Sequence, residues 1–245
     1  MSEARSGTAV RVALRRVTEV GPSEWAEIRD FGSRYFEGEF IASIRAKRDL
    51  VELRGADGRL LGIGAVDLFD VTHEGRTVTV IQGSSAAFLD ETQGMGYVQR
   101  VAFRYFLRAK RSHPLRPVYA AFNTHSWRSN LSLTRTFRLC WPHRSFPPPV
   151  WEAGLYERVG KRLNGDRFDP RTGVAHNRDR RLRPDIAGVP AHLAGDPDVR
   201  YFVEHNPGYP HGDLLVCLVP LNLANWIAAA SRIAGRLRRR RRRSA

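Results

Sequence analysis

The sequence predicts an α/β (α+β) fold with a mixed, mostly antiparallel central sheet, one parallel βαβ crossover and flanking helices. Three observations support this: a β-branched stretch near the N-terminus, a meander of strand-like runs at residues 49–90, and a strand, glycine turn, helix and strand that end at residue 125. Short glycine turns join antiparallel strands, whereas a strand–helix–strand crossover makes two parallel strands. We therefore expect one parallel pair inside an antiparallel sheet.

The N-terminal half supplies the meander and two helices. Residues 10–18 are rich in β-branched side chains and predict a first strand. A helix should begin at Pro22 and Ser23, and residues 40–48 form a shorter amphipathic run. Glycine turns at residues 55–58 and 73–75 divide the meander into three strands.

The crossover helix follows the turn at residues 93–96. Its apolar residues recur at spacings of three and four, which marks one face of a helix: Val98, Val101, Ala102, Tyr105, Phe106 and Ala109. Residues 116–125 then return as a strand, so this strand should lie parallel to the one that ends at Leu89.

The domain organisation follows from changes in composition. We expect residues 1–145 to form the core, residues 146–212 to form an irregular and helical insertion, and residues 213–220 to supply a final core strand. Residues 221–245 predict an amphipathic basic helix and tail. Its apolar residues are Leu223, Trp226, Ile227, Ala230, Ile233, Ala234 and Leu237.

The charge is concentrated in that tail. The formal charge is +15, and subtracting the eight arginines of the last fourteen residues leaves +7. We do not expect nucleic acid as a partner, because the arginine run carries no interleaved aromatic residues. Two readings stay open: a helix on an anionic membrane surface, or a helix packed on the domain. With two cysteines and no apolar leader, we expect a cytoplasmic protein, with possible peripheral attachment to the inner membrane surface.

The glycine turn is the strongest functional signal. A strand ending at Leu89 and a helix beginning near Tyr97 leave backbone N–H groups pointing into the turn. Gly94 and Gly96 have no Cβ to block a ligand, and the helix N-terminus attracts anions, so a pyrophosphate fits there. An ordinary glycine turn remains the alternative from these residues alone.

This turn resembles the acyl-CoA-binding motif of the GNAT-type N-acyltransferase superfamily. Gln93, Gly94, Met95, Gly96, Tyr97 and Val98 occupy the motif. The order of elements over residues 8–145 is also similar, with strand, two helices and three-strand meander upstream of the motif. Val98 stands where the family has a small residue, and Thr134 stands where many members have a tyrosine that protonates the leaving thiolate.

The resemblance implies direct transfer of an acyl group from acyl-CoA or acetyl-CoA, or from an acyl-carrier protein, to a small or amino-acid-like amine. It also implies two strands that splay apart beside the thioester. Implied cofactor-binding residues are Phe88, Leu89, Gln93, Gly94, Met95, Gly96, Tyr97 and Asn123. Catalytic candidates are Asn123, Ser85 and His125, with Ser84 beside them. Acceptor-binding candidates are Arg29, Arg34, Tyr35 and Phe36.

Two functional classes remain after this comparison. The first class is an N-acyltransferase. Its tail and aromatic residues resemble those of the long-chain N-acyl amino acid synthases. The strand at residues 78–88 carries no carboxylate to act as a base, and the usual tyrosine is missing; both favour a catalytically silent GNAT-like scaffold at an anionic membrane. No residue spacing indicates a metal site.

Overall fold

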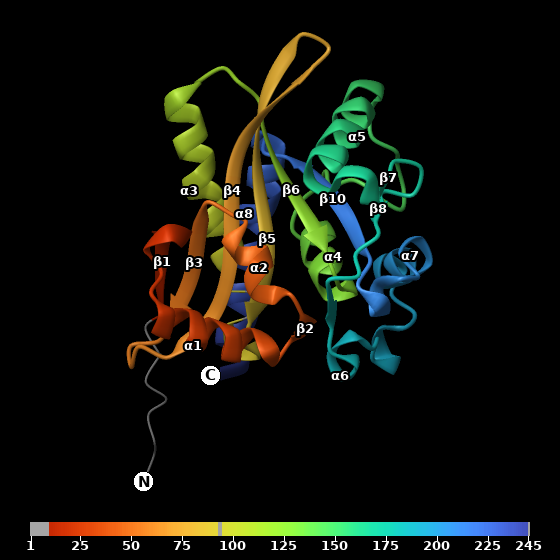
Figure 1. Cartoon of the computed structure of the whole chain (residues 1–245). Helices are drawn as coiled ribbons and strands as arrows, with labels where there is room; N and C mark the ends of the chain where they lie inside the picture. Colours follow the sequence, from red (N-terminus) through yellow and green to blue (C-terminus); the bar gives the residue numbers. More distant parts are fainter. Residues whose placement is uncertain (1–9, 93–94, 245) are drawn as a thin grey trace.

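The computed structural model describes residues 10–92 and 95–244 and is organised around one eight-stranded sheet (Figure 1). In spatial order the strands are β1 (Arg11–Arg16), β3 (Asp49–Arg54), β4 (Leu60–His73), β5 (Arg76–Phe88), β6 (Val118–Thr124), β10 (Leu214–Pro220), β8 (Val174–Ala175) and β7 (Phe168–Asp169). β5 and β6 pair in parallel, and the other neighbours pair antiparallel. The expected fold class is confirmed.

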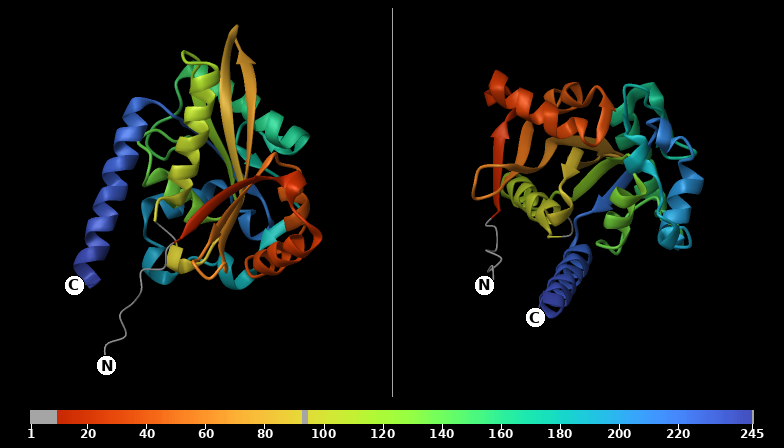
Figure 2. Two further views of the ribbon diagram at one scale, coloured as in Figure 1. Left: turned by 90° about the vertical axis from the view of Figure 1, so that its left-hand side faces the viewer. Right: turned by 90° about the horizontal axis from the view of Figure 1, so that it is seen from below.

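The helices flank this sheet. They are α1 (Pro22–Ser33), α2 (Phe40–Arg45), α3 (Tyr97–Ser112), α4 (Trp127–Thr134), α5 (Val150–Asn164), α6 (Pro184–Ala187), α7 (Pro197–His205) and α8 (Leu223–Ser244). Short 3-10 turns lie at Val17–Glu19, Asp90–Thr92, Gly165–Arg167, Ala191–Leu193 and Tyr209–His211. Figure 2 shows α1 and α2 over one face of the sheet and α3 and α8 on the opposite face.

The parallel pair opens at one end. Pairing of β5 with β6 runs from Thr79 opposite Val118 to Gly83 opposite Phe122 and stops there. Beyond this point β6 stays on β10, with Thr124 opposite Leu215, while β5 stays on β4. The two strands therefore form a fork, as expected for the splayed pair.

A bulge in β5 lies at this fork. Ile63 of β4 is opposite Ala87, but Ala65 is opposite Ser84, so two residues of β5, Ser85 and Ala86, face the single Gly64. Ser85 has φ of 52°, a left-handed conformation that is uncommon for a residue with a Cβ. The bulge turns the Ser85 side chain inward, where its Oγ lies 2.8 Å from Ser43 Oγ of α2.

The segment expected to be an irregular insertion contributes to both sheets. β7 and β8 extend the main sheet beyond β10, and β9 (Arg180–Leu182) pairs with β2 (Phe36–Gly38) in a separate two-stranded sheet. Strands of two or three residues show no alternation that sequence reasoning can detect. The β2–β9 pair ties the chain after α1 to the C-terminal third of the protein.

The C-terminal helix packs on the domain over its first turns. The Asn225 side chain accepts the backbone N–H groups of Arg138 and Leu139 and donates to the carbonyl oxygens of Leu139 and Pro220. Trp226 packs edge-on against Phe103 and Phe106 of α3. Within residues 10–92 and 95–244, no helix combines the length and apolar character needed to cross a bilayer.

Candidate functional site

A cleft of about 820 Å³ occupies the fork between β5 and β6. Its walls come from the last residues of both strands, the N-terminus of α3, one side of α4 and the residues that follow α1. This volume lies within the range of pockets that hold cofactors and small substrates. The fork therefore opens into a space large enough for a ligand.

The open backbone edge of β5 faces the cleft. Beyond Gly83, no strand in the described chain covers β5 on its β6 side, and Ser84, Ser85 and Ala86 line the cleft. The expected backbone site at Phe88 and Leu89 needs correction at Leu89, whose N–H donates to the Leu61 carbonyl at 2.9 Å. Phe88 is opposite Gly62 in the β4–β5 ladder. The bulge residues are thus the better placed group for an extended ligand arm.

The glycine turn meets the cleft through its described residues. Gln93 and Gly94 lie outside the described residues, but Met95, Gly96 and Tyr97 all line the cleft. Gly96 is the N-cap of α3 with φ of 80°, a conformation that favours glycine. It has no side chain to cap the helix, so the first-turn N–H groups of a 16-residue helix face a ligand-sized space.

Arg180 of β9 lies behind the polar wall of the cleft and is 8% exposed. Its Nη1 donates to Ser43 Oγ and, at 3.0 Å, to Ser85 Oγ, and its Nη2 donates to His125 Nε2. The guanidinium also lies 4.8 Å from the centre of the Phe36 ring. Burial lowers the pKa of Arg180 to about 10, which leaves it charged at neutral pH.

His125 is held neutral by this arrangement. Burial lowers its pKa well below the ordinary value, and the neighbouring charge of Arg180 lowers it further. Because Arg180 donates to Nε2, the imidazole proton resides on Nδ1, which has no hydrogen-bond partner. The proposed base would need a free ring lone pair, whereas this geometry gives His125 a spare donor.

Asn123 and the two serines remain candidates with defined surroundings. Asn123 lines the cleft, and its side-chain amide donates to Asn164 Oδ1 of α5 at 2.7 Å. Ser85 accepts from Arg180, while the buried Ser84 Oγ has no partner. Ser84 therefore has unused hydrogen-bonding capacity at the fork.

The acceptor-binding prediction separates into two pairs. Tyr35 and Phe36 line the cleft. Arg29 and Arg34 do not line it: both are exposed, and Arg34 forms an ion pair with Asp30 one helical turn away. Arg29 belongs to the solvent face of α1 and Arg34 follows the last residue of that helix, so their closeness in sequence to Tyr35 does not bring them to the cleft.

Sequence reasoning missed two carboxylates and one acid candidate. Asp90 begins the 3-10 turn two residues after the end of β5, Asp185 belongs to α6, and both line the cleft. Burial raises the pKa of Tyr35, and the nearby charge of Asp90 raises it further, so its phenol keeps its proton at neutral pH. Thr134 donates to the Leu131 carbonyl within α4 and does not line the cleft.

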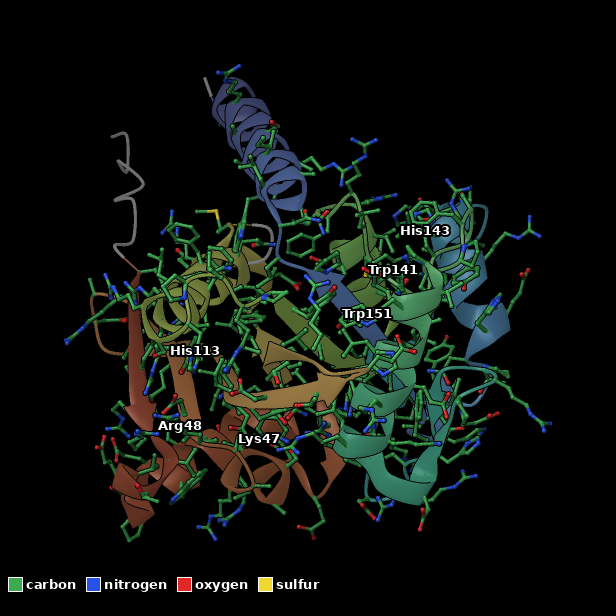
Figure 3. The ribbon with its side chains drawn as sticks, turned by 90° about the horizontal axis from the view of Figure 1, so that it is seen from above. Lys47, Arg48, His113, Trp141, His143 and Trp151 are labelled. Atoms are coloured by element: carbon green, nitrogen blue, oxygen red, sulfur yellow. The ribbon has the colours of Figure 1, made fainter. Side chains whose placement is uncertain are left out.

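Arg180 was also missed, and Lys47 accompanies it. Lys47, labelled in Figure 3, donates to Gln82 Oε1 at 2.9 Å on the α2 side of β5. Burial lowers the pKa of Lys47, the nearby charge of Asp67 raises it, and the Arg180 charge lowers it. Across residues 10–92 and 95–244 no group of three metal-ligating side chains gathers. Lys47 and Arg180 thus place two cations behind this wall, with the carboxylate of Asp67 acting on Lys47.

Comparison with known proteins gives partial structural likeness. No protein-family model matches the sequence, and neither does any curated protein. The GNAT family N-acetyltransferase YhbS from Escherichia coli, solved with CoA, aligns at 14% identity over 53% of this chain and 71% of that one, with TM-score 0.35. An acyl-CoA N-acyltransferase from Pseudomonas aeruginosa aligns at 16% identity over 52% and 86%, with TM-score 0.35.

A GNAT family acetyltransferase from Staphylococcus aureus aligns at 12% identity over 46% of this chain and 86% of that one, with TM-score 0.29. Because each TM-score is below 0.5, we base the functional proposal on the geometry of the cleft itself.

Proposed function

We propose that the protein is an N-acyltransferase that moves an acyl group from acyl-CoA to an amine by direct transfer. One observation carries this proposal: the open edge of β5 and the N-terminus of α3 line the same cleft. An extended thioester arm can pair with the strand edge while its pyrophosphate meets the helix N–H groups. Acetyl-CoA and longer acyl-CoA molecules share both of these parts.

The reaction itself requires positioning and three proton transfers. The amine nitrogen attacks the thioester carbonyl carbon, the C–S bond breaks, and the amide and the free CoA thiol are the products. Backbone N–H groups of the bulge would polarise the carbonyl oxygen. Asp90 or Asp185, directly or through water, would accept the ammonium proton before attack, and the protonated Tyr35 would donate to the leaving sulfur. The second proton that the nitrogen loses, when the tetrahedral intermediate collapses, would return Tyr35 to its protonated form.

A charge placed at the helix N-terminus tests the pyrophosphate site. Val98 is the second residue of α3, is 37% exposed and lines the cleft. Val98→Asp should stabilise the helix through its dipole, yet repel the pyrophosphate and weaken CoA binding by about tenfold or more. Calorimetric titration with CoA measures this affinity.

Val150→Asp is the matched control, because Val150 is the first residue of α5 and is 93% exposed outside the cleft. We expect it to leave CoA affinity unchanged. Equal affinities of the two variants and the wild type would overturn the assignment of the α3 N-terminus to the pyrophosphate.

Two properties of the acyl donor remain to be assigned: the length of its acyl chain, and whether CoA or an acyl-carrier protein carries it. The lining of the cleft includes buried apolar residues, among them Val51, Leu53, Ile81, Leu131 and Leu133. We propose a long acyl chain here, so affinity should rise from acetyl-CoA to palmitoyl-CoA. Equal affinities would contradict a long-chain preference.

An acyl-carrier protein presents the same phosphopantetheine arm as CoA. Turnover with an acylated carrier protein in place of acyl-CoA decides between the two carriers.

A second role, attachment to the cytoplasmic face of an anionic membrane, has its own observation. α3 and α8 expose large apolar side chains, namely Phe103, Leu107, Leu223 and Ile227, in a chain whose C-terminus is rich in arginine. Deletion of residues 236–245 keeps the hydrogen bond from Arg232 to the Phe137 carbonyl and should abolish sedimentation with phosphatidylserine vesicles. Undiminished sedimentation would rule out the arginine anchor. Vesicle binding without any turnover would favour the scaffold.

A further inference from the structure

Arg180 is a buried cation without an anionic partner. Among the residues that the structure describes, no carboxylate forms an ion pair with it, and its contacts are two serine hydroxyls and a neutral imidazole. Removing a charge from water is costly unless an opposite charge compensates it. The buried charge of Arg180 does not favour stability. We therefore look for a ligand that supplies the negative charge.

Arg180 and two residues linked to it have spare hydrogen-bond donors. Three buried polar atoms of these residues have no partner within the described part of the chain: Nε of Arg180, Nδ1 of its neighbour His125, and Oγ of Ser84, which precedes its neighbour Ser85. The Arg180 Nε and the His125 Nδ1 each carry a hydrogen that can be donated, and the serine hydroxyl can donate as well. A group with negative charge that accepts several hydrogen bonds has the chemistry complementary to these donors.

The backbone holds Arg180 in this place. Gly38 of β2 is opposite Arg180 in β9 and has φ of 90°, and a Cβ at Gly38 would lie 2.2 Å from the Asp179 carbonyl oxygen. Glycine is therefore required for this close approach. The rings of Phe36 and Phe40 lie 4.8 and 5.8 Å from the guanidinium carbon, which fixes its orientation.

Arg180 contacts the wall of the cleft directly. Three of its neighbours, Phe36, Ser85 and His125, line the cleft at the fork. A planar carboxylate matches a guanidinium and its neighbouring donors. A cationic ammonium would be repelled at this wall, whereas Asp90 and Asp185 lie on other parts of the lining.

We infer that Arg180, with His125 and Ser84, binds the carboxylate of an amino-acid acceptor whose amine then lies beside the β5 edge. The inference rests on the proposed acyl transfer for the role of the amine, but the carboxylate site stands on the Arg180 contacts alone. It narrows the acceptor from amines in general to amines that carry a carboxylate.

Matched ligand pairs test the site on the wild-type chain. The protein is titrated with L-leucine, L-phenylalanine, L-glutamine and L-arginine, and with the four corresponding carboxamides, in the presence and absence of CoA. We expect at least one acid to bind about tenfold or more tightly than its amide and to shift the imidazole ¹⁵N signals of His125. Equal binding of every acid and its amide, or no binding by any acid, overturns the inference.

Variants on the same strand identify the residue. Arg180→Gln should remove the preference for the acid, whereas Arg181→Gln should preserve it, because Arg181 is exposed and paired with Glu37. Arg180→Lys keeps the charge and should retain part of the preference. If Arg180→Gln fails to fold, the wild-type ligand pairs and the His125 signals still decide the question.

The outcomes separate this inference from the proposed function. CoA binding without any acid preference removes the inference and leaves acyl transfer intact. An Arg180-dependent acid preference without CoA binding keeps the carboxylate site and removes acyl transfer. Succinyl-CoA and butyryl-CoA form the final pair, because only the succinyl group carries a carboxylate. Tighter binding of succinyl-CoA that depends on Arg180, without a preference for any free amino acid over its amide, would assign the carboxylate to the acyl donor. This result would overturn the acceptor assignment.

Discussion

Two buried charges lie on opposite faces of the sheet and have different surroundings. Asp49 of β3 is 5% exposed and accepts a hydrogen bond from Tyr105 of α3 at 2.7 Å, with guanidinium groups of Arg16, Arg48 and Arg108 at 3.3 to 3.8 Å. Arg180 lies on the α2 side and contacts only neutral groups.

The difference distinguishes a structural charge from one placed for a ligand. The charge of Asp49 is compensated within the fold. Burial raises the pKa of Tyr105, and the hydrogen bond from Tyr105 to Asp49 raises it further. Arg180 has hydrogen bonds, but no carboxylate of the described residues forms an ion pair with it. We therefore expect removal of Asp49 to affect folding, and removal of Arg180 to affect binding.

Asp49→Asn should have the largest effect on stability. It leaves three guanidinium groups around a neutral amide, and we expect a loss of about 2–4 kcal/mol, below the value for a fully buried pair because Arg16 and Arg108 are partly exposed. Urea unfolding measures the change. The exposed Asp166→Asn is the control. A loss below about 0.5 kcal/mol, typical of surface sites, would contradict a structural role for Asp49.

The pH dependence of stability should report His125. Its folded pKa is lowered, so the unfolded chain binds one more proton between the two pKa values, and stability falls as pH drops below about 6.5. The contribution of neutral His125 to the free energy of unfolding is complete above that pH. Below it, the free energy of unfolding falls by up to about 1.4 kcal/mol per pH unit.

His125→Gln should flatten this slope, measured from urea unfolding between pH 5 and 7.5. His192→Gln, at an exposed site, should leave it unchanged. An identical slope in the His125 variant and the wild type would show that the imidazole is not held neutral.

Arg180→Met should have the smallest effect on stability. Replacing a buried charge by an apolar chain of similar length is often neutral or stabilising, so we expect the unfolding free energy to stay within about 1 kcal/mol of wild type or to rise. Urea unfolding checks this, with acid-over-amide binding measured on the same sample. A loss comparable with that of Asp49→Asn would make Arg180 a structural residue and remove the contrast.

The sequence predicted those parts of the molecule that have local signals. The glycine turns placed β3, β4 and β5, the apolar spacing placed α3, and Leu214 to Val219 predicted β10. Gly96 was recognised because it has no Cβ to block a ligand and lies between a strand and a helix; the structure adds that it is a left-handed N-cap. These features depend on residues close together in the chain, where periodicity and turn chemistry act.

The missed features depend on contacts between distant segments. Arg180 and Ser43 are 137 positions apart, and the two strands that bring them together have three residues each. The bulge at Ser85 and the hydrogen bond of Leu89 follow from the register with β4, which sequence alone does not fix. Arg29 and Arg34 were misplaced because the turn after α1 directs only Tyr35 and Phe36 into the cleft.

The most direct measurement is amide formation itself. The protein is incubated with acetyl-CoA or palmitoyl-CoA and a mixture of the standard amino acids, and mass spectrometry quantifies N-acyl amino acid and free CoA. Ala86→Trp fills the fork at an exposed bulge residue, and Ala194→Trp adds the same bulk at an exposed site outside the cleft.

We predict equal amounts of both products in the wild type and in Ala194→Trp, and neither product in Ala86→Trp. Absence of N-acyl product in the wild type with both thioesters, or undiminished product in Ala86→Trp, would contradict acyl transfer in the β5–β6 fork.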